Sequence, residues 1–181
     1  HTQRRRQRQM CIRDRSRAVL GGGLIVSAAP PFKDKLDWYR EYLIEQLEQS
    51  GVTIHVNHPA SIEQIKQSNP HIVVLANGGE VNQLNIEGDE NVLVRDAYEL
   101  LMGEKVDIEA DQAREIMVYG GGETGCECAE YLVERGYKVS LVSRSPTKML
   151  ARSAEMIYRG VLLQRLRNNP DITIIDNTAI T

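Results

Sequence analysis

Three glycines are spaced so that the polypeptide backbone could bind a phosphate group. Gly120, Gly122 and Gly125 form the pattern G-x-G-x-x-G directly after a short apolar run at residues 116–119. In such a motif the first glycine permits a tight turn, the second admits backbone N–H groups to a pyrophosphate, and the third lets a helix pack closely on the strand. Negative charge is favoured at the helix N-terminus, where N–H groups are unpaired and the helix dipole is positive.

The glycines need a strand before them, and a helix and a second strand after them. Ala129, Leu132 and Val133 fall on the apolar side of a helical pattern, and Gly136 is a helix stop signal. Residues 139–142 form a second apolar run. This order is the context that a dinucleotide site requires, so the sequence predicts such a site rather than a merely structural turn. The candidate binding residues of the motif are Gly120, Gly122, Glu123, Thr124 and Gly125.

The end of the second strand normally decides which nicotinamide cofactor is bound. An acidic residue there holds the ribose 2′-hydroxyl of NAD, whereas an arginine suits the 2′-phosphate of NADP. In this sequence the position falls at Ser143 and is followed by Arg144, Ser145 and Lys148, with no carboxylate. We therefore expect Ser143 and Arg144 to contact the cofactor and NADPH to bind in preference to NADH. The alternative is that Arg144 is only a solvated loop charge.

The composition is that of an ordinary globular protein. The chain has 181 residues, of which 41% are hydrophobic and 26% charged. No apolar run approaches the roughly 20 residues of a membrane span. The three cysteines do not form a disulfide framework, so we expect a reducing, cytoplasmic setting. Cys126 and Cys128 are too close for C-x-x-C, and we interpret them as small buried side chains rather than redox groups or metal ligands.

The first residues of the chain are strongly basic. Residues 1–17 contain seven arginines and one aspartate, a net charge of +6, so the rest of the chain carries −9. A basic arm on an acidic body would normally suggest nucleic acid or an anionic surface as a partner. However, the string from Met10 to Asp14 resembles the in-frame translation of a common sequencing adapter. We therefore expect residues 1–15 to be a disordered scar, and we expect neither a nucleic acid nor a membrane partner.

Strands alternate with helices along the rest of the chain, which predicts an α/β fold with parallel sheets and helices on both faces. A Rossmann lobe usually needs two βαβαβ halves, and the last part of this chain supplies about one. We therefore expect an incomplete Rossmann-like fold in a chain truncated at both ends. Outside the glycine motif, the expected elements are a helix at 34–49, a strand at 52–56, a short helix capped by Ser61 and Gln64, a buried strand at 71–76, a short helix capped by Asp96 and Glu99, a linker near 104–113, a helix opened by Ser153 and a strand at 172–175.

Four stretches of the sequence resemble one known family. They are GGGLIVSAAPPFK, VVLANGG, EGDENV and VYGGGETGCECAEYL, and they occur in the family's order and spacing. The chain is similar to the C-terminal FAD/NAD(P)-binding part of bipartite NADH:flavin oxidoreductases. This group includes 2,4-dienoyl-CoA reductase and 2-enoate reductase, which join that part to a barrel like that of old yellow enzyme. The resemblance covers residues 16–181.

The resemblance implies two lobes. Residues 16–105 would be part of an FAD-binding lobe, residues 106–113 a linker, and residues 114–181 part of an NAD(P)-binding lobe. Gly22 and Gly23 match a loop that approaches the flavin in the family.

Two further sites follow from the resemblance. Ala76, Asn77 and Gly78 match the family's Ala-Thr-Gly turn, which contacts FAD, although Asn77 replaces the usual threonine. The family's proline-rich crossover is replaced here by residues 81–87. Glu127 matches a glutamate that lies near the nicotinamide in similar proteins. The alternative for Glu127 is a carboxylate that the dipole favours near the start of a helix.

In such enzymes NAD(P)H reduces FAD, and electrons pass through an iron–sulfur cluster to FMN, which reduces a C=C bond of the substrate. The resemblance therefore implies that this chain takes part in hydride transfer from NADPH or NADH to FAD. FMN, the 4Fe-4S cluster and the barrel would belong to an upstream part of the polypeptide. The cofactors carry this chemistry, so we expect no catalytic side chain and no metal site in this chain. His55, His58 and His71 are interpreted as structural or surface residues.

Two other functions stay open. One is a stand-alone pyridine nucleotide–flavin reductase, similar to thioredoxin reductase or to a glutamate synthase small subunit, although Cys126-Glu127-Cys128 is not the C-x-x-C of a thioredoxin reductase. The other is a lobe that binds ADP without hydride transfer, as in amine dehydrogenases of the same family. We expect the chain to be inactive on its own, because the primary pyrophosphate loop for FAD is missing.

Overall fold

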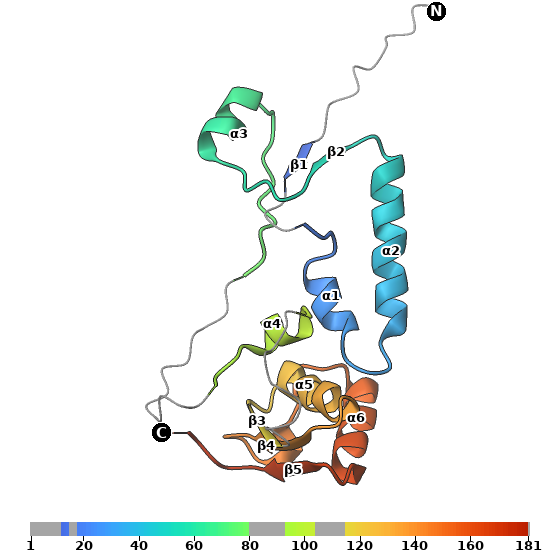
Figure 1. Cartoon of the computed structure of the whole chain (residues 1–181), viewed down its shortest axis with the longest axis vertical. Coiled ribbons are helices and arrows are strands. Elements are labelled where there is room, and N and C mark those ends of the chain that lie inside the picture. Colours follow the sequence, from blue (N-terminus) through green and yellow to red (C-terminus); the bar gives the residue numbers. More distant parts are fainter. Residues whose placement is uncertain (1–11, 15–17, 80–92, 104–114, 181) are drawn as a thin grey trace, which may run out of the picture. The chain divides into compact units, whose positions relative to one another are not determined.

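The computed structural model describes residues 12–14, 18–79, 93–103 and 115–180 (Figure 1). The chain divides into two compact units. The first consists of His1–Leu24 and Lys35–Gly79, and the second of Ile25–Asp34 and Glu80–Thr181. The polypeptide therefore joins the second unit over residues 25–34 before it returns to the first. The predicted linker at 104–113 lies outside the described residues.

The second unit is built around a three-stranded parallel sheet. Its strands are β3 (Glu115–Tyr119), β4 (Lys138–Val142) and β5 (Ile172–Ile175), in the order β3-β4-β5. Helix α5 (Glu123–Glu134) connects β3 to β4, and helix α6 (Met156–Asn168) lies between β4 and β5 in the chain. The predicted α/β fold with a parallel sheet is confirmed.

The strand register aligns the carboxyl ends of the three strands. Tyr119 at the end of β3 pairs with Val142 at the end of β4, and Val142 pairs with Ile175 at the end of β5. The carboxyl ends of all three strands therefore lie at one edge of the sheet. In open α/β sheets, ligands bind in the crevice outside this edge.

The core of the second unit lies between the sheet and its helices. The fully buried large side chains are Leu141 of β4, Leu162 and Leu166 of α6, and Leu150 of the loop before α6. The short helix α4 (Ala97–Leu101), which Asp96 caps as predicted, adds a buried leucine to the same cluster. The 3₁₀ turn η1 (Thr147–Met149) precedes α6.

Helix α6 begins later than the sequence suggests. The expected start was Ser153, but the N-cap is Glu155 and the helix starts at Met156. The Glu155 carboxylate accepts hydrogen bonds from the backbone N–H groups of Tyr158 and Ile157, each at 2.9 Å. These bonds stabilise the ionised form and lower the pKa of Glu155. A carboxylate cap therefore replaces the serine cap that we expected.

The described part of the first unit contains the 16-residue helix α2, the short helix α3 and a small sheet. Helix α2 (Asp34–Gln49) and strand β2 (Thr53–His55) fall close to the predicted positions. Helix α3 (Ile62–Ser68) has the predicted capping box, in which the Ser61 side chain accepts from the N–H of Gln64 and the Gln64 side chain accepts from the N–H of Ser61.

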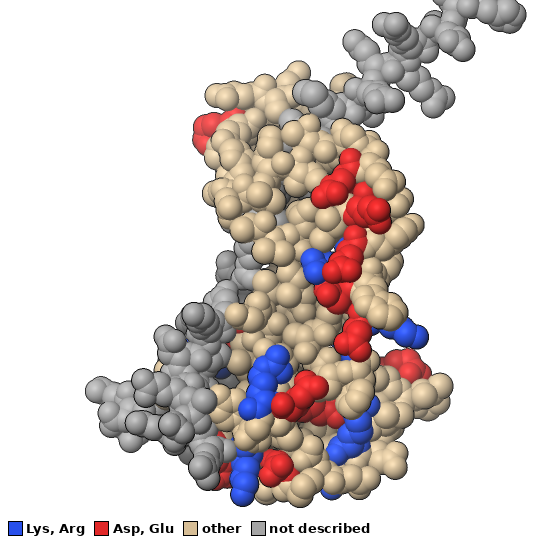
Figure 2. Space-filling view, turned by 45° about the vertical axis from the view of Figure 1, so that its right-hand side comes forward, with Lys and Arg blue, Asp and Glu red and all other residues tan. Residues whose placement is uncertain are grey.

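Helix α2 carries a row of acidic residues. Figure 2 shows the acidic side chains along this helix, and four of them fall at helical spacing, namely Asp37, Glu41, Glu45 and Glu48. Arg40 donates to the Asp37 carboxylate at 2.7 Å.

In the described part of the chain, no helix combines the length and the apolar character needed to cross a membrane.

The predicted buried strand at residues 71–76 is wrong. The structure has no strand there, and Ile72, Val74 and Leu75 are 79%, 81% and 82% exposed. An apolar run becomes a buried strand only when neighbouring strands accept its hydrogen bonds and a helix covers it. The described residues of the first unit contain only the two-stranded sheet of β1 and β2, and this sheet does not include residues 71–76.

Two N-terminal segments also differ from expectation. Strand β1 (Ile12–Asp14) lies inside residues 1–15, which we expected to lack structure, and it pairs in parallel with β2. A strand pair forms through backbone hydrogen bonds, so it does not need the periodic apolar face whose absence suggested disorder. Helix α1 (Gly23–Ala28) begins within the stretch that matched a flavin loop.

Candidate functional site

The glycines of the motif form the turn between β3 and α5. Gly120 directly follows β3 and has a φ of +129°, in the region that favours glycine. Its N–H donates to the carbonyl of Val142 at 2.9 Å, which ties the turn to the end of β4. The turn therefore lies at the carboxyl edge of the sheet.

Close packing explains two of the glycines. A Cβ atom on Gly125 would overlap the backbone carbonyl oxygen of Gly120, so α5 can approach the turn only because this position has no side chain. A Cβ atom on Gly121 would overlap the side chains of Leu150 and Ser143. At both positions the space on the Cβ side is therefore filled by the protein's own atoms.

Gly122 lies in a different environment. It is the N-cap of α5, its φ of −70° is accessible to any residue, and a Cβ atom there would point into open space. No side chain forms a hydrogen bond at this cap. The first N–H groups of α5 and the positive end of its dipole therefore lie beside an open cradle, which fits a phosphate group.

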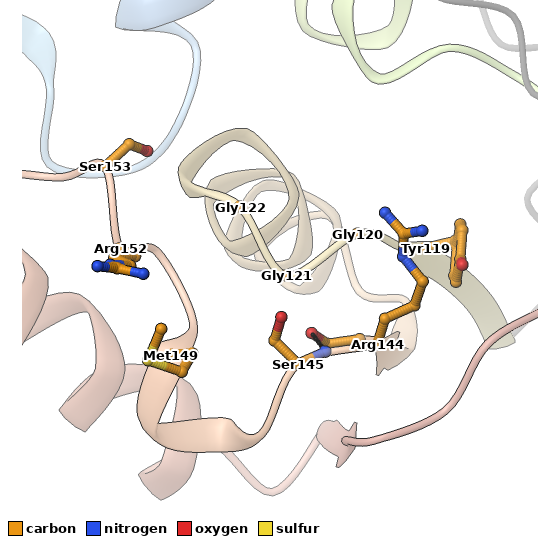
Figure 3. Close-up of a pocket in the computed structure, with 10 residues that line it drawn as sticks. Tyr119, Gly120, Gly121, Gly122, Arg144, Ser145, Met149, Arg152 and Ser153 are labelled. Carbon is orange, nitrogen blue, oxygen red and sulfur yellow. Dashed lines mark hydrogen bonds between the residues drawn. The ribbon is translucent and has the colours of Figure 1, made fainter.

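A cavity of about 790 Å³ lies at this edge of the sheet (Figure 3). Its walls come from the glycine turn, from the residues after β4 and from the loop before α6. The volume is in the range of small-molecule and cofactor sites, which is about 300–1,000 Å³. The lining residues are Tyr119, Gly120, Gly121, Gly122, Ser143, Arg144, Ser145, Met149, Arg152 and Ser153. Four of the predicted binding residues therefore line one cavity.

Ser143 shapes the turn after β4. Its N–H donates to the carbonyl of Ile175 at 2.8 Å, and its own carbonyl accepts from the N–H of Thr178 at 2.9 Å. Its hydroxyl accepts from the N–H of Ser145 at 3.1 Å, and the residue is buried. These bonds hold the turn in the position from which the next residue, Arg144, projects.

Two arginines give the cavity a positive charge. Figure 3 shows Arg144 extending from the turn after β4 towards Gly120. Arg152 lies on the other side of the cavity, on the loop before α6, next to Ser153. Both side chains are exposed. Guanidinium groups pair well with phosphates, so the cavity suits a ligand that carries several anionic groups.

Sequence reasoning missed Arg152. The sequence pattern predicts a helix start at Ser153 and gives the arginine before it no binding role. The available signal was its charge, eight residues after Arg144 and directly before the predicted helix.

Three other predicted binding residues, Glu123, Thr124 and Gly125, lie in the first turn of α5 and do not line the cavity.

Glu127 lies on α5, away from the cavity lining. It is buried and forms an ion pair with Lys33, whose side chain is 15% exposed, against 7% for Glu127. The hydroxyl of Tyr158 on α6 also donates to the Glu127 carboxylate, at 2.7 Å. Burial and this hydrogen bond raise the pKa of Tyr158. The Lys33 ammonium lies 4.8 Å from the centre of the Tyr158 ring.

A second buried carboxylate on the same helix is also paired. Glu130 accepts two hydrogen bonds from the guanidinium of Arg165 on α6, at 2.6 and 2.8 Å. These bonds raise the pKa of Arg165. The same guanidinium lies 4.7 Å from the ring centre of Phe32. Residues 25–34 are thus held to the second unit through Phe32 and Lys33, and we name them the strap.

The residues matched to a flavin site lie elsewhere in the chain. Gly22 and Gly23 precede and begin α1, whereas Ala76, Asn77 and Gly78 belong to an exposed segment without regular structure. None of these five residues lines the cavity beside Gly122. Their contact with FAD stays a prediction.

The two described cysteines are buried thiols with raised pKa values. Cys126 and Cys128 are buried and free, as predicted. Burial raises the pKa of the Cys126 thiol to about 12 and that of Cys128 to about 11, so both stay protonated near neutral pH.

The rings of His55 and His58 meet edge to face, with their centres 5.4 Å apart. Among the described residues, no group of three or more His, Cys, Asp and Glu could hold a metal ion.

Known proteins resemble this chain over much of its length. NADH oxidase of Thermoanaerobacter brockii is 40% identical over 125 residues, which are 68% of this chain and 19% of the relative. Cinnamate reductase of Clostridium sporogenes is 35% identical over 127 residues, which are 68% of this chain and 17% of the relative. The chain therefore spans about a fifth of the length of these relatives.

A solved structure shares the fold. The structure of 2-naphthoyl-CoA reductase in complex with 2-naphthoyl-CoA matches with a TM-score of 0.80 at 20% identity, over 93% of this chain and 24% of that one. These likenesses confirm the resemblance to the nucleotide-binding part of bipartite oxidoreductases. Residues 69–181 match the family described as pyridine nucleotide-disulphide oxidoreductase. The chain belongs to this family of oxidoreductases, whose cofactors are a flavin and a pyridine nucleotide.

Proposed function

We propose that the cavity beside Gly122 binds the diphosphate and the adenosine ribose of NADPH, and that this chain takes part in hydride transfer from that cofactor to FAD. The observation that carries the proposal is the open cradle at Gly122, which lies between the uncapped N–H groups of α5 and two arginines. NADPH supplies the hydride, whereas the protein's residues contribute binding, orientation and charge. The residues that we propose for the pyridine nucleotide are Gly120, Gly122, Glu123, Thr124, Gly125, Glu127, Ser143 and Arg144, and those for FAD are Gly22, Gly23, Ala76, Asn77 and Gly78.

The chain would act as the electron-input part of a larger enzyme. Its relatives are about four times as long as this chain, which supports a further domain with FMN and a 4Fe-4S cluster in the whole protein. Two of the similar proteins are named as reductases of cinnamate and of 2-naphthoyl-CoA, which supports an unsaturated carboxylate or thioester as the final electron acceptor.

The proposal is tested by closing the cradle. In Gly122→Ala the new methyl group points into open space, so the fold stays intact, but it occupies the place proposed for the diphosphate. We expect NADPH to bind at least about 10-fold more weakly, which corresponds to 1.4 kcal/mol. Fluorescence titration with NADPH measures the change.

Gly160→Ala is the matched control, because Gly160 is exposed on α6 and its Cβ position is also open. Equal affinity of the two variants would contradict the assignment. If the wild-type chain binds ADP as tightly as NADPH, and the whole protein shows no flavin reduction by NADPH, the ADP-binding lobe becomes the better account.

The choice between NADPH and NADH depends on Arg144. The name of NADH oxidase of T. brockii favours NADH, whereas a positive charge and no carboxylate after β4 favour NADPH. In Arg144→Gln we expect NADPH to bind about 10- to 100-fold more weakly, because one charge-assisted contact is lost, and NADH affinity to stay constant. Parallel titrations with both nucleotides measure the ratio. Tighter binding of NADH than NADPH by the wild-type chain would refute the role of Arg144.

A further inference from the structure

One wall of the cavity is a loop without regular structure. Residues 150–155 connect η1 to α6, and Arg152 and Ser153 of this loop line the cavity together with Met149, the last residue of η1. A loop normally has more freedom than the elements that it connects. Arg152 can contribute to binding only if the backbone on both sides of it is held in place.

The loop is anchored to the sheet and to the glycine turn. The N–H and the hydroxyl of Thr147 both donate to the Asp176 carboxylate at 2.6 Å. The N–H of Ala151 donates to the carbonyl of Gly121 at 2.8 Å. Ala151 is fully buried with a φ of +48°, a conformation that alanine rarely adopts. Contacts from outside the loop must therefore stabilise it.

Arg159 supplies such a contact. It lies on the first turns of α6 and is absent from the cavity lining. Its Nε donates to the carbonyl of Leu150 at 2.8 Å, and its Nη2 donates to the carbonyl of Lys148. One guanidinium thus binds two carbonyls of the segment that precedes Arg152. The planar fork of arginine suits two acceptors, whereas a lysine ammonium is a point charge on a flexible stem.

We propose that Arg159 is a positioning residue of the nucleotide pocket. By binding the carbonyls of Lys148 and Leu150, it holds Arg152 at the cavity wall, where Arg152 pairs with a phosphate group of the nucleotide. Arg159 acts through Arg152 and does not touch the ligand. The pairing of Arg152 rests on the proposed function, whereas the holding of the loop does not.

The first test measures the loop without any nucleotide. Trypsin cleaves after Lys148 and Arg152, so cleavage at these two bonds reports how often the loop opens. In Arg159→Met we expect cleavage there at least about 10-fold faster than in the wild-type chain, as measured by mass spectrometry of the products. Arg167→Met is the control, because Arg167 is an exposed arginine in the last turn of the same helix.

If trypsin cleaves Arg159→Met throughout the second unit, this variant is unfolded. The test is then made with Arg159→Lys, because lysine keeps the positive charge but lacks the planar fork of the guanidinium. Unchanged cleavage after Lys148 and Arg152 in a folded variant would overturn the proposal.

The second test links the loop to the ligand by a double-mutant cycle. Arg152→Met and Arg159→Met should each weaken NADPH binding about 10-fold, and the double variant should bind no more weakly than either single variant. Effects that multiply would show that Arg159 does not act through Arg152. If the wild-type chain does not bind NADPH, the proposed function and the role of Arg152 fail, and the trypsin test still decides whether Arg159 holds the loop.

Discussion

Gly125→Val is expected to lower the free energy of unfolding of the second unit by about 3 kcal/mol or more, at the upper end of overpacking effects. The Cβ atom alone would overlap the carbonyl oxygen of Gly120, and a backbone atom cannot move aside as a flexible side chain can. Relief requires α5 to move away from β3. Such a movement would disturb the buried contacts of Cys126 and Ala129 on the same helix.

Urea denaturation followed by far-ultraviolet circular dichroism measures this effect. Gly160→Val is the matched control, since Gly160 also lies inside a helix but its Cβ position is open. Valine has a higher helix propensity than glycine, so we expect the control to be as stable as the wild-type chain or slightly more stable. Equal stability of the two valine variants would show that the approach of α5 to the turn is looser than in the structure.

Lys33→Met is expected to be almost as damaging, with a loss of about 3 kcal/mol, because it leaves the buried Glu127 carboxylate without its cation. The hydroxyl of Tyr158 would remain as a donor to this carboxylate, but it carries no charge. The methionine keeps the apolar stem of the lysine, so the loss reports on the charge rather than on packing. The same urea titration measures it.

Two variants make the Lys33 prediction specific. Lys35→Met removes an exposed lysine two residues further along and should change stability by less than about 0.5 kcal/mol. Lys33→Met/Glu127→Gln removes both charges and should recover much of the loss, since no unpaired carboxylate stays buried. A Lys33→Met variant as stable as Lys35→Met would mean that the ion pair contributes nothing to the fold.

Local patterns predicted the second unit well because its elements follow one another closely in the chain. The strands at Glu115–Tyr119, Lys138–Val142 and Ile172–Ile175 each lie within one residue of the expected ends. Each strand has an adjacent parallel partner, and the apolar residues of the central strand β4, Val139, Leu141 and Val142, are buried. Residues 71–76 have an equally apolar sequence, yet they are exposed because no described strand pairs with them.

Long-range partners were the main obstacle to predicting the site. A helical pattern assigns Glu127 and Glu130 to solvent, whereas both are buried against charges that lie 94 and 35 residues away in the chain. Similarly, the loop that carries Arg152 turns at a buried alanine with φ +48°, and alanine does not signal such a turn. Gly120, Gly122, Ser143 and Arg144 were predictable, because a known motif determines their spacing.

The strap makes the second unit discontinuous along the gene. A recombination or truncation that cuts within residues 104–114 would separate residues 25–34 from helices α5 and α6, which they contact. Without the strap, the core of the second unit would lose Val26, and the Glu127 carboxylate would lose its cation, Lys33. The two units of this chain therefore cannot be exchanged between proteins as independent modules unless the strap travels with the second unit.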